Sequence, residues 1–94
     1  MNQKKSDIAK MLESGRSQMQ AGRLQQAESV FHKILQHDSR QPEALYLAGI
    51  IALQTGQNQK AAGLLGQAVS VQPDNPHFLY HLGLAAMALN NIDM

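Results

Sequence analysis

The chain of 94 residues contains no cysteine, which excludes disulfide bonds, a thiolate nucleophile and thiolate-bound zinc. Charged residues make up only 16% of it, and the formal net charge at pH 7 is +1. Residues 1–40 carry most of the basic side chains, but seven Lys or Arg against four acids is a small excess. Proteins that bind nucleic acid through charge carry stronger basic patches, so we expect no nucleic-acid partner.

The chain also lacks a long hydrophobic segment. Charged side chains interrupt residues 8–13, so the basic start is not followed by the apolar core of a signal peptide. The longest uncharged apolar run, residues 44–53, spans ten residues. That is about half of the roughly 20 residues that a membrane-crossing helix needs. We therefore expect a cytoplasmic protein with no membrane partner.

Strand-forming residues are scarce as well. Val, Ile and Thr together occur nine times, whereas Ala, Leu and Gln each occur 12 times. This composition favours an all-α fold. Hydrophobic patterns and helix-ending residues predict five helices, at residues 7–21, 24–38, 42–54, 58–71 and 76–89. We expect residues 1–6 to form a flexible N-terminal tail and residues 7–94 a single domain.

Several residue types recur at positions i and i+34, which indicates an internal repeat. The recurring sets are Gly15, Gly49 and Gly83; Gly22, Gly56 and Asn90; Ala27 and Ala61; Pro42 and Pro76; and Tyr46 and Tyr80. Chance does not readily give one offset to so many residue types. The interval divides the chain into units 8–41 and 42–75 and a partial unit 76–94.

The recurring glycines and alanines predict close contact between helices. Gly49 and Gly83 lie in the middle of predicted helices, where glycine costs about 1 kcal/mol relative to alanine. A close approach of two helix backbones would offset this cost. Antiparallel pairing of the two helices of a unit would place Gly15 opposite Ala27 and Gly49 opposite Ala61, small residue against small residue.

The remaining recurring residues suit the ends of helices. Gly22, Gly56 and Asn90 fit left-handed caps, a conformation that glycine and asparagine adopt most easily. Pro42 and Pro76 suit the first helical position, with Asn75 as an N-cap, and Pro73 closes the preceding helix.

These residues resemble the signature of the tetratricopeptide repeat family. In the second unit, the eight signature places hold Leu45, Ala48, Gly49, Ala52, Ala61, Leu65, Ala68 and Pro73. The first unit keeps Gly15, Ala27 and Phe31, and the third supplies Leu79, Leu82, Gly83 and Ala86. The resemblance implies a right-handed α-solenoid of antiparallel helix pairs, with a concave groove lined by the first helix of each pair. It also implies a protein that binds peptides, helices or other proteins.

The family geometry turns one stripe of each first helix toward the groove. Tyr46, Ile50 and Leu53 form this stripe on helix 42–54, at positions i, i+4 and i+7. Equivalent and neighbouring positions complete the expected groove: Leu12, Arg16, Met19, Glu43, Tyr46, Ile50, Leu53, His77, Tyr80, Leu84 and Met87.

This wall is mostly apolar and favours an apolar peptide or an amphipathic helix as ligand. Some family members instead hold a peptide carboxylate with Lys, Asn and Arg side chains. Arg16 is the only such candidate here, so a carboxylate clamp is disfavoured. In an alternative interpretation, further repeats, another domain or a second copy of the chain covers the apolar stripe.

The last predicted helix carries a second apolar face. In a complete unit Leu79, Leu82, Gly83 and Ala86 would be buried against a following helix. Natural arrays end in a polar capping helix, whereas residues 82–89 carry no charge. We hypothesise that the chain is a fragment of a longer protein, and that this helix drives homo-oligomer formation through dimerisation or helix exchange.

No pattern predicts catalysis, a metal site or a cofactor. His77 and His81 have the i, i+4 spacing of metal ligands, but a third ligand and an intervening glutamate are missing. A phosphate-binding loop and a nucleophile elbow are also absent. We therefore expect no enzymatic activity from this chain. Because repeats of this kind occur beside catalytic domains, a substrate-presenting arm of a larger enzyme, such as a glycosyltransferase, stays a further alternative.

Overall fold

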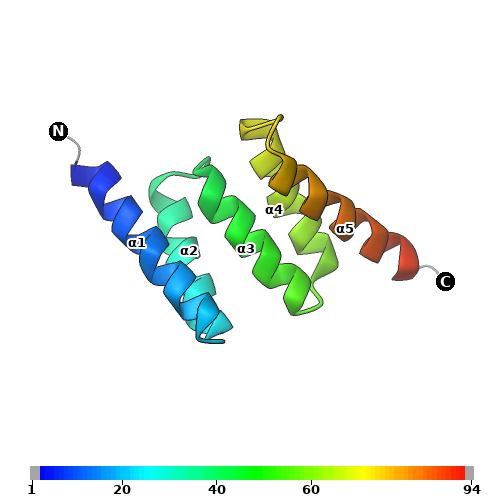
Figure 1. Cartoon of the computed structure of the whole chain (residues 1–94), viewed down its shortest axis with the longest axis horizontal. Helices are drawn as coiled ribbons and strands as arrows, with labels where there is room; N and C mark the ends of the chain where they lie inside the picture. Colours follow the sequence, from blue (N-terminus) through cyan, green and yellow to red (C-terminus); the bar gives the residue numbers. More distant parts are fainter. Residues whose placement is uncertain (1–2, 93–94) are drawn as a thin grey trace.

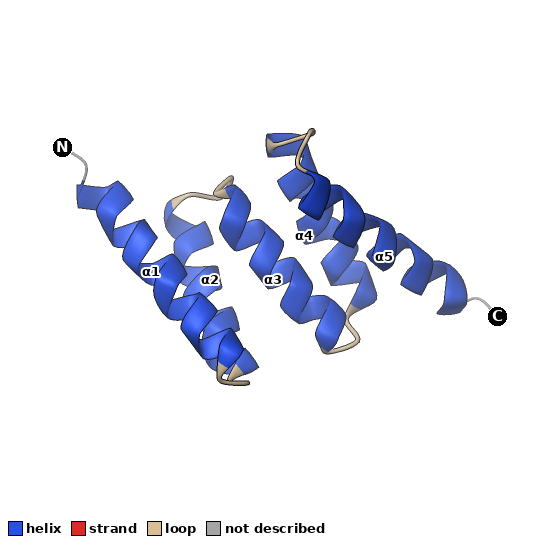
Figure 2. Cartoon of the chain, viewed as in Figure 1, coloured by secondary structure: helices blue, strands red, loops and turns tan. Residues whose placement is uncertain are grey.

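The computed structural model describes residues 3–92, which form five α-helices joined by short turns (Figure 2). They are α1 (Gln3–Gln20), α2 (Leu24–His37), α3 (Pro42–Gln54), α4 (Asn58–Val71) and α5 (Pro76–Ile92). Residues 3–92 contain no strand, and the prediction of an all-α chain with five helices is confirmed.

The helices stack into two layers. The first layer consists of α1, α3 and α5, and the second consists of α2 and α4, which lie behind it in Figure 1. Each second-layer helix packs against two first-layer helices: α2 against α1 and α3, and α4 against α3 and α5. This alternation gives an elongated body of 50 × 28 × 20 Å.

The predicted bounds of α2, α3 and α4 are correct to within one residue, whereas the outer helices are longer than predicted. Helix α1 begins at Gln3, so part of the predicted tail at residues 1–6 is helical, and Met1 and Asn2 lie outside the described residues. Helix α5 runs on to Ile92. The predicted left-handed cap at Asn90 is therefore wrong, because Asn90 continues the helix. Asparagine, unlike glycine, pays a steric cost in the left-handed conformation.

The two hairpin turns have the same glycine conformation and the same pair of backbone hydrogen bonds. Gly56 has a φ of +78°, and its N–H donates to the Leu53 carbonyl at 3.1 Å. The next N–H, from Gln57, donates to the Ala52 carbonyl at 2.8 Å. The same arrangement occurs one repeat earlier around Gly22, whose φ is +80°. In both turns these bonds satisfy carbonyl groups at the helix end that would otherwise have no partner, as is common where a helix ends at a glycine. Both predicted glycine caps are confirmed.

Helices α3 and α5 begin with equivalent caps. The Gln41 side-chain oxygen accepts a hydrogen bond from the Ala44 N–H at 2.8 Å. The Asn75 side-chain oxygen accepts from the His77 N–H at 2.9 Å, which confirms the predicted N-cap. A proline follows each cap as the first residue of its helix. Proline has no backbone N–H, but an N–H at this position would have no partner within the helix, so no hydrogen bond is lost.

The mid-helix glycines accommodate large side chains. A Cβ atom added to Gly49 would lie 2.7 Å from Cγ of Leu65, and one added to Gly15 would lie 2.4 Å from Cε1 of Phe31. Leu65 and Phe31 are fully buried. The predicted close contact is confirmed at both glycines, but the predicted pairing with small residues is wrong: the side chain that fills the space lies one turn beyond Ala27 or Ala61.

Candidate binding groove

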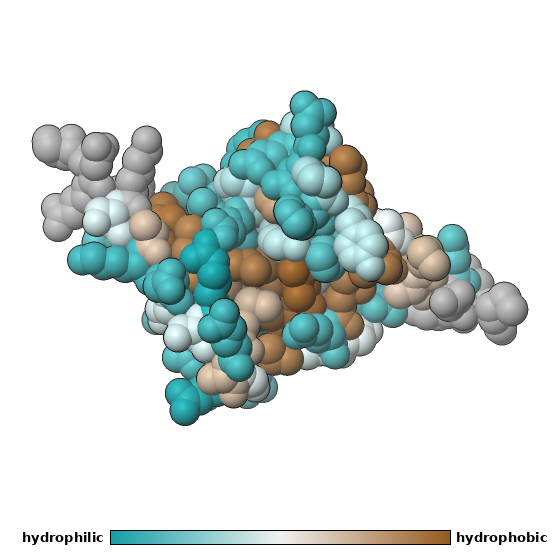
Figure 3. Space-filling view, in the orientation of Figure 1, coloured by the Kyte–Doolittle hydropathy of each residue, from teal (hydrophilic) through white to brown (hydrophobic). Residues whose placement is uncertain are grey.

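The first-layer helices present an apolar band on one face of the molecule. Figure 3 shows this band over α3 and the adjoining flank of α5, with hydrophilic side chains along its edges. Between α3 and α5 the surface is hollowed into a cleft of about 310 Å³. The cleft is lined by Ile50, Leu53, Gln54, His81 and Leu84. Three of the predicted groove residues, Ile50, Leu53 and Leu84, therefore lie together around one hollow.

The other predicted groove residues on α5 lie in the open. Tyr80 is 64% exposed and Met87 is 63% exposed. They follow the same stripe of α5 as Leu84, since they lie at the i−4 and i+3 positions relative to it. This stripe continues the apolar cleft along α5 and leaves both side chains accessible to a ligand.

The α1 end of the predicted groove differs from expectation. Leu12 is only 7% exposed and belongs to a core cluster with Phe31 and Ala48, so it is not part of the groove wall. Met19 is partly buried against the same cluster. Because α1 packs closely on α2 and touches α3, Leu12, the equivalent of Tyr46, is buried in the core here, whereas Met19 is only partly buried, like its equivalent Leu53.

Tyr46 is held in place by α5. Its ring lies 4.7 Å from the Phe78 ring and meets the His81 ring edge-on at 5.2 Å, between centroids. Its hydroxyl lies 3.2 Å from Nδ1 of His81. Partial burial raises the pKa of Tyr46 above its ordinary value of 10.0, because the phenolate would lose hydration. The phenol therefore stays protonated at neutral pH.

The surroundings of His81 fix which groups donate. Its Nδ1 lies 2.9 Å from the backbone carbonyl of His77, and a carbonyl only accepts, so Nδ1 carries the proton. The Tyr46 hydroxyl lies within hydrogen-bond distance of the same nitrogen, so this contact links α3 to α5. No group of three metal-ligating side chains occurs among the described residues.

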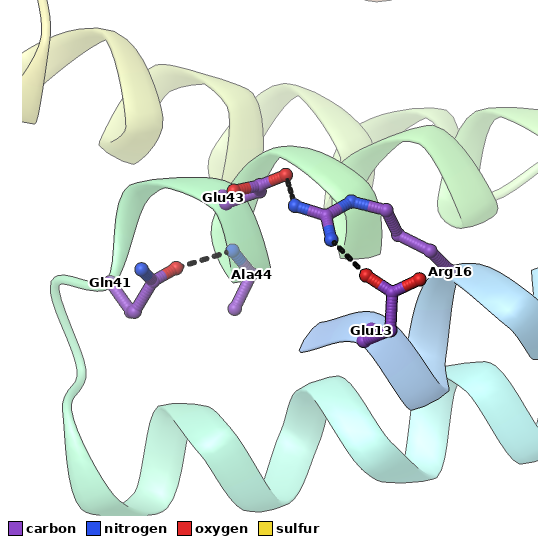
Figure 4. A network of polar contacts seen from close by, with 5 residues as sticks. All are labelled: Glu13, Arg16, Gln41, Glu43 and Ala44. Carbon is purple, nitrogen blue, oxygen red and sulfur yellow. Dashed lines mark hydrogen bonds and ion pairs between the residues drawn. The ribbon is translucent and has the colours of Figure 1, made fainter. Parts of the chain in front are cut away.

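An ion pair marks the hydrophilic edge of the groove next to α1. Arg16 of α1 pairs with Glu43 at the start of α3, and it also lies 3.5 Å from Glu13 (Figure 4). Arg16 and Glu43 side chains are 37% and 40% exposed, and a pair in such a position contributes about 0–1 kcal/mol to stability. Arg16, the lone positive charge predicted for the groove, is thus neutralised by two carboxylates.

The structure also forms a second hollow, of about 410 Å³, which the sequence did not predict. Its lining includes His77 and Glu43, together with residues of the α2–α3 and α4–α5 turns. The full lining is Gln41, Pro42, Glu43, Tyr46, Gln72, Asn75, His77 and Phe78. The repeat could have predicted this hollow. Gln41 and Asn75 are one repeat apart, and equivalent turns of stacked units lie side by side.

Comparison with known proteins agrees with this architecture. Residues 18–78, about two thirds of the chain, match the tetratricopeptide repeat (TPR) family. The chain belongs to the TPR family. It is a protein-interaction repeat module, and modules of this family are generally not catalytic.

A solved structure of a mutant O-GlcNAc transferase from Thermobaculum terrenum is similar to the TPR chain, with a TM-score of 0.87 and 26% sequence identity. The match covers 90% of this chain and 16% of that one, so the chain spans a small part of that protein's length. The predicted TPR-like solenoid is thereby confirmed. No curated protein matches the chain. No helix within residues 3–92 has the length and apolar character needed to cross a bilayer.

The third TPR unit exposes a second face on α5, beside the groove stripe. Leu79 is 47% exposed, and Gly83 and Ala86 are exposed as well. Leu82, which was predicted to lie on this face, is partly buried against Ala61 of α4 and its neighbours. The free part of this face consists of Leu79, Gly83 and Ala86, and we refer to these three residues as the outer face of α5.

Proposed function

We propose that this TPR module binds an apolar peptide or an amphipathic helix in the groove between α3 and α5. The observation that carries the proposal is the apolar cleft lined by Ile50, Leu53 and Leu84, continued along α5 by the exposed Tyr80 and Met87. Covering such a surface gains about 25 cal/mol per Å² of apolar area.

Polar groups at the edge of the groove refine the proposal. Arg16 is occupied by Glu43 and Glu13, so it is not free to capture a peptide carboxylate. The ligand would therefore bind mainly through apolar side chains, with few directional contacts.

Replacing Leu84 by Glu should weaken ligand binding by about tenfold or more, because a charge would be buried under the ligand. The probe is an 18-residue peptide of Leu, Ala, Lys and Glu that forms an amphipathic helix and has no net charge. Its binding to the chain is measured by fluorescence anisotropy. A scrambled peptide of the same composition should bind at least about tenfold more weakly, because its apolar side chains no longer share one face.

Leu79→Glu is the matched control, since it places the same charge on the same helix but on the outer face. It should leave the affinity for the amphipathic probe unchanged. Circular dichroism should give the same helicity for both variants. Equal loss of binding in Leu79→Glu and Leu84→Glu would contradict the groove as the binding site.

A second candidate function is self-assembly through the outer face of α5. The exposed Leu79 beside Gly83 and Ala86 favours it, because apolar side chains on a free helix face stabilise association when covered. Sedimentation equilibrium at several concentrations should then give a mass that rises with concentration, and Leu79→Glu should restore the monomer mass. A folded chain that stays monomeric throughout would exclude this candidate.

A third candidate is a substrate-presenting arm of a larger enzyme. It is supported by the similarity to part of an O-GlcNAc transferase, of which the chain covers 16%. The full reading frame of the gene would decide it, since a glycosyltransferase domain would have to be encoded in the same frame. For each of these candidates we propose a cytoplasmic location, which cell fractionation checks.

A further inference from the structure

The second hollow lies beside the apolar cleft, toward the start of α3. Tyr46 lines the hollow, and Ile50, one helical turn further along α3, lines the cleft. The hollow contains three amide side chains, those of Gln41, Gln72 and Asn75. A ligand that follows α3 would therefore meet an apolar cleft at one end of its path and a group of amides at the other.

The oxygen atoms of these three amides already accept hydrogen bonds within the chain. Oε1 of Gln41 accepts from the backbone N–H of Ala44 at 2.8 Å (Figure 4). Oδ1 of Asn75 accepts from backbone N–H groups in the first turn of α5. Because a backbone N–H only donates, the atom it bonds in each amide must be the oxygen. Oε1 of Gln72 in turn accepts from Nδ2 of Asn75 at 3.0 Å.

The amide nitrogens, in contrast, can bind a ligand. Nε2 of Gln41 and Nε2 of Gln72 donate to no other described residue, and Nδ2 of Asn75 keeps one proton after its bond to Gln72. Glu43, the acidic residue of the lining, is paired with Arg16. The groups left for a ligand are therefore mainly hydrogen-bond donors, and they fit a ligand that presents acceptors.

An α-helix presents acceptors at its C-terminus, where the carbonyl groups of the last turn have no partner within the helix. We propose that the second hollow binds the last turn of the ligand helix, and that the amide nitrogens of Gln41, Gln72 and Asn75 donate to its free carbonyl groups. The inference rests on the proposed groove function and adds the direction of the ligand. These bonds are the few directional contacts of an otherwise apolar interface.

The direction follows from the position of the hollow. Helices α3 and α5 both begin there, at Pro42 and Pro76, so a ligand helix that ends in the hollow runs antiparallel to both. The negative end of its dipole then lies beside the positive ends of α3 and α5, which agrees with the direction set by the hydrogen bonds.

The length of the groove suits a helix of ordinary size. Gln41 lines the hollow, and Gln54, at the other end of α3, lines the cleft. At about 1.5 Å per residue, the chain rises about 20 Å between them. A helix of 18 residues is about 27 Å long, so it can cover the cleft and reach the hollow at the same time.

Gln41→Glu tests the hydrogen bonds. The carboxylate keeps an oxygen for the Ala44 N–H, so the cap of α3 is retained, but a second oxygen replaces the Nε2 donor and repels ligand carbonyl groups. The neutral 18-residue probe, acetylated at its N-terminus and amidated at its C-terminus, should bind about fivefold more weakly or worse in anisotropy titrations.

Gln67→Glu is the matched control for this substitution. Gln67 is exposed on α4 and lines neither the cleft nor the second hollow, so its replacement should leave the affinity for the probe unchanged. Both variants should keep the helicity of the parent chain in circular dichroism.

Disulfide formation tests the direction, and it is selective because the chain has no cysteine of its own. Gln54→Cys places one thiol at the cleft end of the groove. The probe carries one cysteine at position 4 or at position 15, which are equally far from its two ends and lie on the same face of the helix. In a glutathione redox buffer the position-4 probe should form at least about fivefold more disulfide with the chain, since only this cysteine comes close enough to bond.

Three results would overturn the inference. One is equal affinity of the probe for the parent chain and Gln41→Glu. Another is equal or greater disulfide formation by the position-15 probe, because the C-terminus of the ligand would then not be held in the hollow. The third is binding only by a probe with a free C-terminal carboxylate, since the hollow would then hold a carboxylate and not helix carbonyl groups.

Failure of this inference is distinguishable from failure of the groove proposal. If only the inference is wrong, the probe still binds the parent chain, and Leu84→Glu still weakens that binding. If the probe does not bind the parent chain at all, both the groove proposal and the inference are wrong.

Discussion

Phe31→Ala is expected to lower the free energy of unfolding by about 3–5 kcal/mol. Phe31 is fully buried, and its ring lies over Gly15 at the centre of the first hairpin. Truncation would leave a cavity there, because the glycine opposite offers no side chain to fill it. Small domains are stable by about 5–15 kcal/mol, so the variant should lose a substantial fraction of its stability in urea or thermal unfolding.

Tyr80→Ala provides the control for this experiment. It also removes an aromatic ring, but Tyr80 is 64% exposed, so its loss should change stability by no more than about 0.5 kcal/mol. If both variants unfolded at the same urea concentration, Phe31 would not have the central packing role that the structure gives it.

The fold could be predicted largely because its features depend on spacing. Gly22 and Gly56 need a left-handed conformation that few other residues adopt, so their positions mark the hairpin turns. Asn75 caps α5 with its own side chain. Such local requirements can be inferred from residue type alone, and the constant repeat interval then orders them into units.

Features that depend on side-chain size across a contact were harder to predict. The sequence indicates that Gly49 needs close contact, but not that Leu65 rather than Ala61 fills the space. The repeat likewise predicts that Leu12 is equivalent to Tyr46. It does not predict that Leu12 lies in the core while Tyr46 lies under α5, because the two units have different neighbours.

The candidate groove was predictable only in part for the same reason. Helix periodicity and the repeat place Ile50, Leu53 and Leu84 on equivalent stripes, and the family resemblance implies that these stripes face the groove. The pairing of Arg16 with Glu43 joins positions whose separation is unrelated to the repeat, and it depends on how far two side chains reach between units. The hydrogen bond between Tyr46 and His81 also crosses from one unit to the next.

Helix α5 combines three environments on a single element. One stripe, with Phe78 and Ala85, is buried against its neighbours, and a second, with Tyr80 and Leu84, borders the groove. The third is the outer face. The outer face adjoins the groove stripe, since Gly83 lies three residues after Tyr80 and four before Met87, and residues at these spacings share one side of a helix. Leu79 and Leu84 lie farther apart around the helix, so Leu79→Glu and Leu84→Glu would separate effects on the outer face from effects on the proposed groove.

Gly49→Leu is expected to destabilise the chain by about 1–3 kcal/mol or more, through overpacking of the second hairpin. An added Cβ would already lie 2.7 Å from Cγ of Leu65, and Leu65 is fully buried and has no free space to move into. Either α3 and α4 separate or Leu65 leaves its place. In a domain of this size, each kcal/mol lost lowers the melting temperature by about 4–8 °C.

Gly63→Leu tests the same substitution on the neighbouring helix, where an added Cβ would have no atom within 4 Å apart from its sequence neighbours and its own helix backbone. There the better helix propensity of leucine should stabilise the chain by up to about 1 kcal/mol. The two variants should thus shift the melting temperature in opposite directions, although both replace a mid-helix glycine. If Gly49→Leu melted at or above the parent temperature, the close approach of α3 and α4 would not depend on a glycine at that position.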